Sequence, residues 1–386
     1  MSHAILRGCP TEAQLYLDTI IDATRESLKN GNNKKERSQV NLGEIIYYSM
    51  KRNLDGIFMI NGASGETISN RQILSTALPL ALAISSNYEA GTVIMLLMRN
   101  HQYMAATYYA SIFANVVPLL VDPNSTAYEL RHFLNLVSPS AVFCDHDLYD
   151  DVKNALNDLM NTQIKTIISD DSERLEEFFK GHITNLDNCL GHRISQATPK
   201  TDVLLIPTSG STGLSKATIL THGGVVAQLP VIWAYHNSFP RPEKLALLLS
   251  SAQWMTYTIL MTTCPVYGVS LLMTPKKPTT EHVLQIIDTY RPTWGLLGPT
   301  FAKSLAASAV PSQLSSIGTI VTAGAPLTEN IVTLLKEKLS QSASLRNGIG
   351  MTETQSFIAI SDNDRQWTTN GKIVNIMLYK ASNIML

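Results

Sequence analysis

Cysteine is scarce in this sequence, and its four cysteines stand far apart. They are Cys9, Cys144, Cys189 and Cys264, and no two of them form the closely spaced pair that a zinc site or a redox motif requires. Small secreted domains held by disulfides carry cysteine at a much higher density, so a disulfide framework is not indicated either. We therefore expect a protein of a reducing intracellular compartment.

An excess of one charge and long apolar runs are also missing. The chain has 30 Lys and Arg against 31 Asp and Glu, so it lacks the basic balance typical of nucleic-acid binding. No apolar run approaches the roughly 18 residues of a membrane span, and the first residues contain none long enough for a signal peptide. The last residues, Ile-Met-Leu, differ from the Ser-Lys-Leu type of peroxisomal signal. We expect neither a nucleic-acid partner nor a membrane span.

Strand-like apolar runs alternate with helical patterns from about residue 41 onward. The clearest run, residues 92–97, is apolar nearly throughout, and a helical pattern over 101–114 and a second run at 116–121 follow it. Ser69 is placed to cap a further helix. This βαβ rhythm predicts an α/β fold of stacked doubly wound sheets flanked by helices. Further strands are expected at residues 56–60, 140–144, 164–168, 203–206, 245–249, 270–273, 294–297 and 319–322.

The most informative segment is a strand that runs into a loop rich in Gly, Ser and Thr, with a Lys behind it. Glycines let the backbone approach a polyphosphate, hydroxyls and amides donate hydrogen bonds to its oxygens, and Lys adds a positive charge. The spacing is not that of a Walker A loop, because Gly210 and Gly213 are three residues apart. A short cluster of this composition is more often a surface turn, but its length and order favour phosphate binding. The candidate residues are Thr208, Ser209, Gly210, Ser211, Thr212, Gly213 and Lys216.

This loop, Thr-Ser-Gly-Ser-Thr-Gly-Leu-Ser-Lys, resembles the phosphate-binding signature of the adenylate-forming superfamily, which includes acyl-CoA synthetases, coumarate-CoA ligases, beetle luciferases and nonribosomal adenylation domains. Residues 322–327 resemble the family's Gly-Ala-Pro-Leu turn, a pattern that on its own is more often a plain strand-to-helix connection. Residues 345–354 resemble the Gly-Tyr-Gly-Met-Thr-Glu segment, at the family's spacing from the other two motifs. The resemblance covers roughly residues 41–360.

The resemblance implies ATP-dependent activation of a carboxylic acid to an acyl-adenylate, which coenzyme A then attacks. Thr352 would touch the α-phosphate or the acyl carboxylate, and Glu353 would help to hold Mg²⁺ with Thr212, since carboxylate and hydroxyl oxygens suit this ion. Ile349 stands where the family usually has Tyr, so aromatic packing on the adenine is lost. The catalytic candidates are Lys216, Thr352 and Glu353. The other nucleotide-binding candidates are Gly324, Ala325, Pro326, Arg346, Asn347, Gly348, Ile349, Gly350, Met351 and Thr352.

Residues 249–258 occupy the place where many family members present a His beside the acyl pocket, and no His is present here. Trp254, with Met255 and Met261, either lines an acyl pocket or belongs to the core, and the core is the commoner case for such residues. We interpret three other histidines as structural: His222, His236 and His282.

The same resemblance predicts the domain organisation. Residues 1–40 would be a solvated extension, 41–366 the AMP-binding domain and 367–386 the start of an incomplete β-barrel subdomain, with apolar residues 373–378 at a sheet edge. The family's ribose-binding segment and its C-terminal domain, with a catalytic Lys, find no counterpart, so we expect a truncated product or a gene-model fragment with impaired turnover.

Two interpretations stay open. The chain is an acyl-CoA ligase homologue for a fatty or aromatic acid, or a non-catalytic nucleotide-binding protein, and an unrelated scaffold is a distant third. Family resemblance suggests the peroxisome, but the chain has no terminal signal for it, and the cytoplasm is the alternative.

Overall fold

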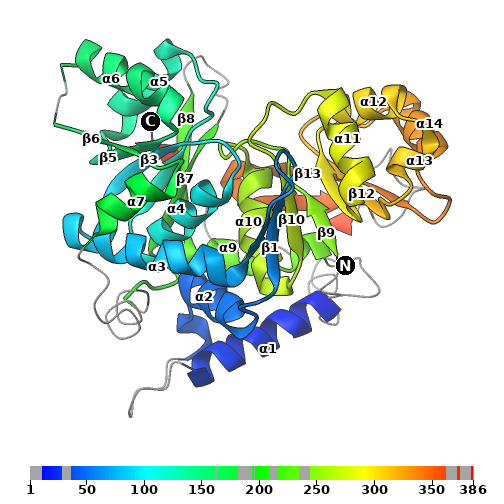
Figure 1. The fold of residues 1–386 in the computed structure, drawn as a ribbon. Coiled ribbons are helices and arrows are strands. Elements are labelled where there is room, and N and C mark those ends of the chain that lie inside the picture. The colour runs from blue at the N-terminus through cyan, green and yellow to red at the C-terminus, as the bar shows by residue number, and fades with distance from the viewer. Residues whose placement is uncertain are drawn as a thin grey trace.

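The computed structural model describes residues 11–27, 36–160, 163–180, 194, 196–208, 215–233 and 244–361, together with the backbone of 372–373 and 384–385. Within these residues the chain forms two large, mostly parallel sheets with helices packed on their faces (Figure 1). The predicted α/β class with stacked sheets is confirmed.

The seven-stranded sheet has the order β16-β8-β7-β4-β3-β5-β6. Its central pairings, from β7 through β6, are parallel, whereas β7 pairs with β8 and β8 with β16 in the antiparallel direction. The central strands are buried on both faces, which explains why they appear in the sequence as continuous apolar runs. The strands are β3 (Val93–Leu97), β4 (Val117–Leu120), β5 (Ala141–Cys144), β6 (Lys165–Ile168), β7 (Asp202–Thr208), β8 (Lys216–Thr221) and β16 (Ile384–Met385).

The nine-stranded sheet has the order β15-β14-β13-β12-β11-β9-β10-β1-β2. Its strands from β13 to β1 run parallel, and antiparallel strands complete it at both edges. The strands are β1 (Ile57–Asn61), β2 (Thr67–Ser69), β9 (Leu245–Leu247), β10 (Ser270–Met273), β11 (Trp294–Leu297), β12 (Thr319–Thr322), β13 (Ser344–Met351), β14 (Ser356–Ile360) and β15 (Lys372–Ile373).

Two helices carry much of the core that joins the sheets. Every residue of α4 from Met104 to Phe113 is buried, and the Tyr109 hydroxyl donates a 2.6 Å hydrogen bond to the Met261 carbonyl of α10. Ser69 caps α3 as predicted, accepting a hydrogen bond from the backbone of Gln72. The helices are α1 (Glu12–Ser27), α2 (Leu42–Arg52), α3 (Asn70–Asn87), α4 (Gln102–Phe113), α5 (Ala127–Val137), α6 (Tyr149–Asp158), α7 (Ser172–Phe179), α9 (His222–Gln228), α10 (Met255–Tyr267), α11 (Thr280–Tyr290), α12 (Pro299–Ser308), α13 (Pro311–Leu314) and α14 (Glu329–Lys338).

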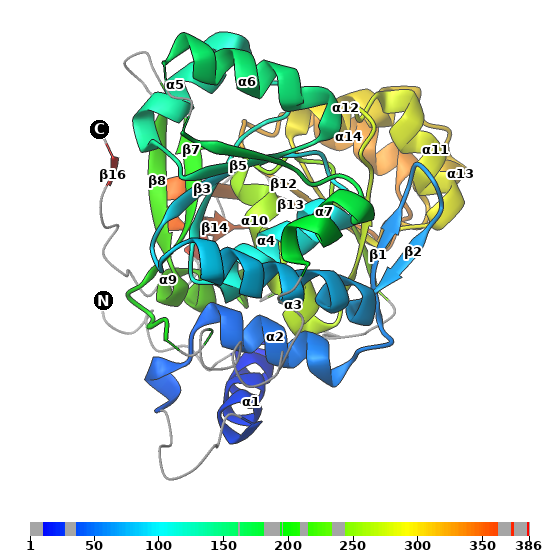
Figure 2. The same ribbon diagram turned by 60° about the vertical axis from the view of Figure 1, so that its left-hand side comes forward.

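The N-terminal region differs from the expected solvated extension. Residues 12–27 form α1, which lies beneath α2 in Figure 2, and its Leu17 and Ile20 side chains are buried in the main core. The Tyr267 hydroxyl of α10 donates a 2.9 Å hydrogen bond to the carbonyl oxygen of Ala13. Most of the polar stretch over 29–37 lies outside the described residues, but α1 itself is packed on the globular unit.

The described parts of the tail supply two short strands. Strand β15 pairs with β14 at the edge of the nine-stranded sheet, and β16 pairs with β8 at the edge of the other. The remaining residues of the predicted barrel segment lie outside the described residues. Among the helices that the structure describes, none is both long enough and apolar enough to cross a membrane.

Candidate functional site

The carboxyl edges of the two sheets meet. The Asn100 side chain, which follows β3, donates a 2.9 Å hydrogen bond to the Ser250 carbonyl, which follows β9. The Ser251 hydroxyl and the Gln253 amide donate to Asp122, which follows β4, over 2.7 and 3.1 Å. Ligands of open α/β sheets bind outside the carboxyl ends of the strands, so this meeting line is the expected place for a site.

The predicted phosphate loop connects two paired strands. Thr208 ends β7 and faces Lys216, the first residue of β8, so the loop between them closes a hairpin. Five of the predicted residues lie outside the described part of the chain: Ser209, Gly210, Ser211, Thr212 and Gly213. The far end of the loop is held by His132 of α5, whose Nε2 lies 2.6 Å from the Ser215 carbonyl oxygen and donates to it.

The two downstream motifs lie side by side. Strands β12 and β13 are parallel, and Thr322 is level with Asn347. Both segments therefore leave the sheet at the same end, where β12 leads into the Gly324 turn and β13 continues to Ile349. Gly324 has a positive φ of 90°, a conformation that favours glycine, and it starts an exposed turn with Ala325 and Pro326.

Strand β13 bends back into β14, and its glycines are needed for this close pairing. A Cβ on Gly348 would lie 2.5 Å from the Phe357 ring, and a Cβ on Gly350 would lie 2.5 Å from the Ser356 carbonyl oxygen. Between and after these glycines, the side chains of Ile349 and Met351 are 43% and 51% exposed. The strand therefore presents apolar side chains at the carboxyl edge of the sheet, where an adenine ring is expected.

Arg346 and Asn347 are hydrogen-bonded to Ser361, which follows β14. The Arg346 guanidinium donates to the Ser361 carbonyl over 3.0 Å. The backbone N–H of Asn347 donates to the Ser361 hydroxyl over 2.9 Å, and its carbonyl accepts from the Ser361 N–H. Both residues thus tie β13 to the end of β14, and their predicted contact with nucleotide stays a prediction.

Thr352 and Glu353 belong to the short 3₁₀ helix η5 (Thr352–Thr354), which packs against β8, the strand that Lys216 begins. Both side chains are half-buried. A second contact lies directly after η5. There the Gln355 side-chain amide occupies the space that a side chain on Gly224 of α9 would need. The structure thus brings the elements of all three catalytic candidates together.

Glu353 fits the kind of Mg²⁺ site that nucleotide enzymes use. Among the described residues no group of three or more His, Cys, Asp or Glu side chains could enclose a metal. Mg²⁺ at a nucleotide is usually held by one or two carboxylates together with substrate phosphates, so a single carboxylate is compatible with it. The second predicted ligand, Thr212, lies outside the described residues.

The three acyl-pocket candidates differ in how deeply they are buried. Met261 is fully buried in the core, as the commoner interpretation predicted, and Met255 is partly buried. Trp254, at the start of α10, is 59% exposed and is not a core residue. His222 is buried, and His282 is hydrogen-bonded to Thr274, in keeping with their structural interpretation, while His236 lies outside the described residues.

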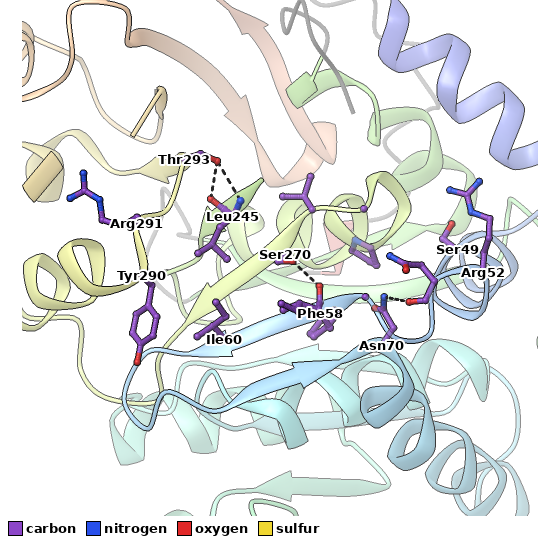
Figure 3. Close-up of a pocket in the computed structure, with 16 residues that line it drawn as sticks. Ser49, Arg52, Phe58, Ile60, Asn70, Leu245, Ser270, Tyr290, Arg291 and Thr293 are labelled. Carbon is purple, nitrogen blue, oxygen red and sulfur yellow. Dashed lines mark hydrogen bonds between the residues drawn. The ribbon is translucent and has the colours of Figure 1, made fainter. Parts of the chain in front are cut away.

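A cleft of about 550 Å³ lies away from these residues (Figure 3). It is lined by the amino ends of β1, β9 and β10, and there the Ser270 hydroxyl donates to the Ile57 carbonyl over 2.7 Å. None of the predicted site residues lines it. Because β1, β9 and β10 run parallel, this cleft and the predicted site lie at opposite edges of the nine-stranded sheet.

Two further residues lie at the candidate site and were not predicted from the sequence. His132, which holds the end of the phosphate loop, stands in an ordinary amphipathic helix, and no local signal marks it. Asp122 is not among the predicted site residues, although a carboxylate directly after a buried parallel strand is a signal of a residue at the carboxyl edge.

Comparisons with known proteins identify the family and the fold. The family model described as "AMP-binding enzyme" matches residues 47–378. The probable 4-coumarate–CoA ligase 1 of Dictyostelium discoideum is 22% identical over 327 residues, which cover 80% of this chain and 59% of that protein. The luciferin 4-monooxygenase of Photuris pensylvanica is 27% identical over 361 residues, covering 86% and 63%. The chain thus spans about three fifths of the length of the curated relatives that it matches.

Solved structures show the same fold at low identity. The luciferase-like enzyme of the nonluminescent mealworm Zophobas morio superposes with a TM-score of 0.72 at 18% identity, covering 89% of this chain and 81% of that one. The N-terminal subdomain of Klebsiella oxytoca NpsA, in complex with anthranilyl-AMSN, gives 0.66 at 14% identity, covering 83% and 77%. Because the family model matches most of the sequence, the chain belongs to the AMP-binding enzyme family of adenylate-forming proteins.

Proposed function

We propose that this chain binds ATP and a carboxylic acid and joins them as an acyl-adenylate, with release of pyrophosphate. The observation that carries the proposal is the packing of η5 on β8, because it brings the segment of Thr352 and Glu353 to the strand that Lys216 begins. Membership of the family and the meeting of two sheet edges at this place add support.

In the proposed reaction, a carboxylate oxygen attacks the α-phosphorus of ATP and the bond to the pyrophosphate oxygen breaks. Lys216 supplies positive charge to the phosphate oxygens, and the Thr352 hydroxyl donates a hydrogen bond to the α-phosphate or to the acyl carboxylate. Glu353, with Thr212, would hold Mg²⁺, which neutralises phosphate charge. A single positioned electrostatic group of this kind is commonly worth about a hundredfold in rate.

For the acid, we propose a fatty or aromatic carboxylate, and for the acceptor of the acyl group, coenzyme A. Two observations support this. Several similar proteins are named as 4-coumarate–CoA ligases, and Trp254, at the start of α10, is 59% exposed and so offers an apolar surface outside the core.

Calorimetry tests the nucleotide assignment. Lys216→Ala should weaken ATP binding roughly tenfold or more, because a hydrogen bond to a charged group contributes about 1.5–3 kcal/mol. Lys200→Ala, which removes an exposed lysine at a turn before β7, serves as the matched control and should leave the affinity unchanged. Equal ATP affinity in wild type and Lys216→Ala would contradict the proposal.

Exchange of pyrophosphate into ATP, measured with a panel of carboxylic acids, tests the chemistry. Acid-dependent exchange that is lost in Thr352→Ala supports adenylation. Nucleotide binding without exchange for any acid would instead favour the second interpretation, a nucleotide-binding protein without turnover.

A further inference from the structure

The cleft at the amino ends of β1, β9 and β10 has the size and the lining of a small-molecule site. Its volume of about 550 Å³ falls within the range of roughly 300–1,000 Å³ that is typical of ligand pockets. Such pockets are mostly apolar, with a few polar groups that orient the ligand. The apolar lining residues here are Ile57, Phe58, Ile60, Leu245, Pro265 and Val269. Because the cleft lies at the edge opposite the predicted adenylate site, the proposed function does not use it.

The charged side chains that line the cleft are both arginines. Figure 3 shows Arg52 at one end and Arg291 at the other. Among the described residues that line the cleft there is no Asp or Glu. Arg291 lies 3.4 Å from the Asp288 carboxylate and donates to the Ser312 carbonyl over 3.0 Å, so its charge already has a partner. The end at Arg52 is therefore the positive end of the cleft.

The Arg52 guanidinium has donors to spare. Its described hydrogen bond goes to a neutral group, the Tyr16 hydroxyl, over 2.8 Å. Within the part of the chain that the structure describes, Arg52 takes part in no ion pair. A cation in the last turn of a helix complements the partial negative charge there, which is one reason for an Arg at the end of α2. That role uses the charge of Arg52 and leaves most of its N–H groups open to an anion.

Tyr16 of α1 holds this guanidinium in place. The Tyr16 ring packs against the ring of Tyr267 at the end of α10, with 5.3 Å between the ring centroids. The Tyr267 hydroxyl is in turn bonded to the Ala13 carbonyl of α1. Arg52 is thus fixed at the end of the cleft before any ligand binds, which lowers the entropy lost on binding. A planar guanidinium pairs with a carboxylate through two parallel hydrogen bonds.

Ser49 adds a second polar group at the same end. It stands three residues before Arg52 on α2, and this spacing places both on one face of the helix. Ser49 lines the cleft and is 4% exposed, and its hydroxyl has no hydrogen-bond partner among the described residues. Buried hydroxyls are normally hydrogen-bonded, so this one lacks a partner that a water or a ligand would supply.

We propose that this cleft is a second ligand site, separate from the adenylate site, and that it binds a carboxylic acid with an apolar body. The carboxylate pairs with the Arg52 guanidinium, and the apolar body lies along Ile57, Ile60 and Val269. This inference goes beyond the proposed function and does not depend on it.

The test is a calorimetric titration with octanoate, after octanoyl-sulfamoyl adenosine has filled the adenylate site. Wild type should bind one further octanoate. Arg52→Gln should weaken this binding about fivefold, because it removes a charge-assisted pair. Tyr16→Phe keeps the ring but frees the guanidinium, and it should weaken binding about twofold. The control is Arg71→Gln, which removes an exposed arginine paired with Asp55 outside the cleft and should change nothing.

Two further comparisons test the apolar body and the charge of the ligand. Ile57→Asp places a negative charge in the cleft at a residue that is 46% exposed, so it should fold and should weaken octanoate binding. Val310→Asp, at a residue 55% exposed and outside the cleft, is its control. The uncharged 1-octanol should bind several-fold more weakly than octanoate.

AMP affinity should be the same in all these variants, and melting temperatures check that each one folds. Absence of a further octanoate site, an equal effect of Arg52→Gln and Arg71→Gln, or equal binding of 1-octanol and octanoate would overturn this inference and leave the proposed function standing. If octanoyl-sulfamoyl adenosine and AMP do not bind, the proposed function fails. Octanoate binding that depends on Arg52 would in that case still support the second site.

Discussion

The Nε2 atom of His132 lies 2.6 Å from the carbonyl oxygen of Ser215, the last residue before β8. A carbonyl can only accept, so His132 carries its proton on Nε2 and donates it. The hydrogen bond anchors the exit of the predicted phosphate loop to α5, an element that otherwise covers the outer face of the seven-stranded sheet.

His132→Ala should weaken ATP binding by about fivefold, because a typical hydrogen bond contributes about 1 kcal/mol and its loss frees the end of the loop. Calorimetry with ATP measures the change. His132→Gln, whose amide can still donate, should recover part of the affinity. His146→Ala, an exposed histidine of another element, should have no effect, and an equal loss in both alanine variants would argue against the anchor.

Gly350→Ala should destabilise the protein by about 1–3 kcal/mol, the usual range for overpacking, since the new Cβ would meet the Ser356 carbonyl oxygen at 2.5 Å. Chemical denaturation measures the free energy of unfolding. Gly295→Ala in β11 is the matched control, because its Cβ would have no neighbour closer than Leu297 at 3.9 Å. If both variants lost stability equally, the close pairing of β13 and β14 would not be the reason.

Ile349→Tyr should tighten adenine-nucleotide binding roughly two- to tenfold, because ring stacking adds about 0.5–1.5 kcal/mol beyond burial. The Ile349 side chain is 43% exposed at the carboxyl edge, so a larger ring has room. AMP titration provides the measurement. Ile57→Tyr, which changes a similarly exposed isoleucine at the opposite edge, is the control. Weaker AMP binding by Ile349→Tyr would show that Ile349 does not lie at the adenine site.

His282 should make stability depend on pH. Burial, with a smaller contribution from Lys276, lowers the pKa of His282 below its ordinary 6.5, and its Nε2 lies 2.9 Å from the Thr274 hydroxyl. The unfolded chain therefore binds this proton more readily than the folded one. The contribution of His282 to the stability of the folded state is complete above pH 6.5 and is lost as the pH falls through the lowered pKa.

The melting temperature of wild type should accordingly decrease as the pH is lowered from about 7.5 to about 5. In His282→Gln this decrease should be smaller. Calorimetric scans of both proteins provide the comparison, and the difference between them isolates His282 from other titrating groups. A variant with the same pH dependence as wild type would show that His282 contributes nothing to it.

The sequence by itself predicted most of the buried parallel strands and singled out the candidate phosphate loop. Buried parallel strands appear as short continuous apolar runs, so residues 92–97 and 203–206 were located from their composition alone as β3 and β7. Ser69 was placed as a helix cap because capping depends on neighbours within three residues. The predicted phosphate loop and the Gly-rich segment before Thr352 stand out in the sequence because close approach to a ligand would restrict residue type locally.

Only the tertiary structure decided which of these segments meet. No local pattern indicated that η5 packs on β8, or that Gly348 and Gly350 face β14 across a tight pairing. Ser251 and Asp122 are 129 residues apart, and their hydrogen bond exists because two separately formed sheets pack with their carboxyl edges together. Such a contact depends on how the two layers are placed relative to each other. The packing of the shared core sets this placement, and the residues next to Ser251 or Asp122 in the sequence do not encode it.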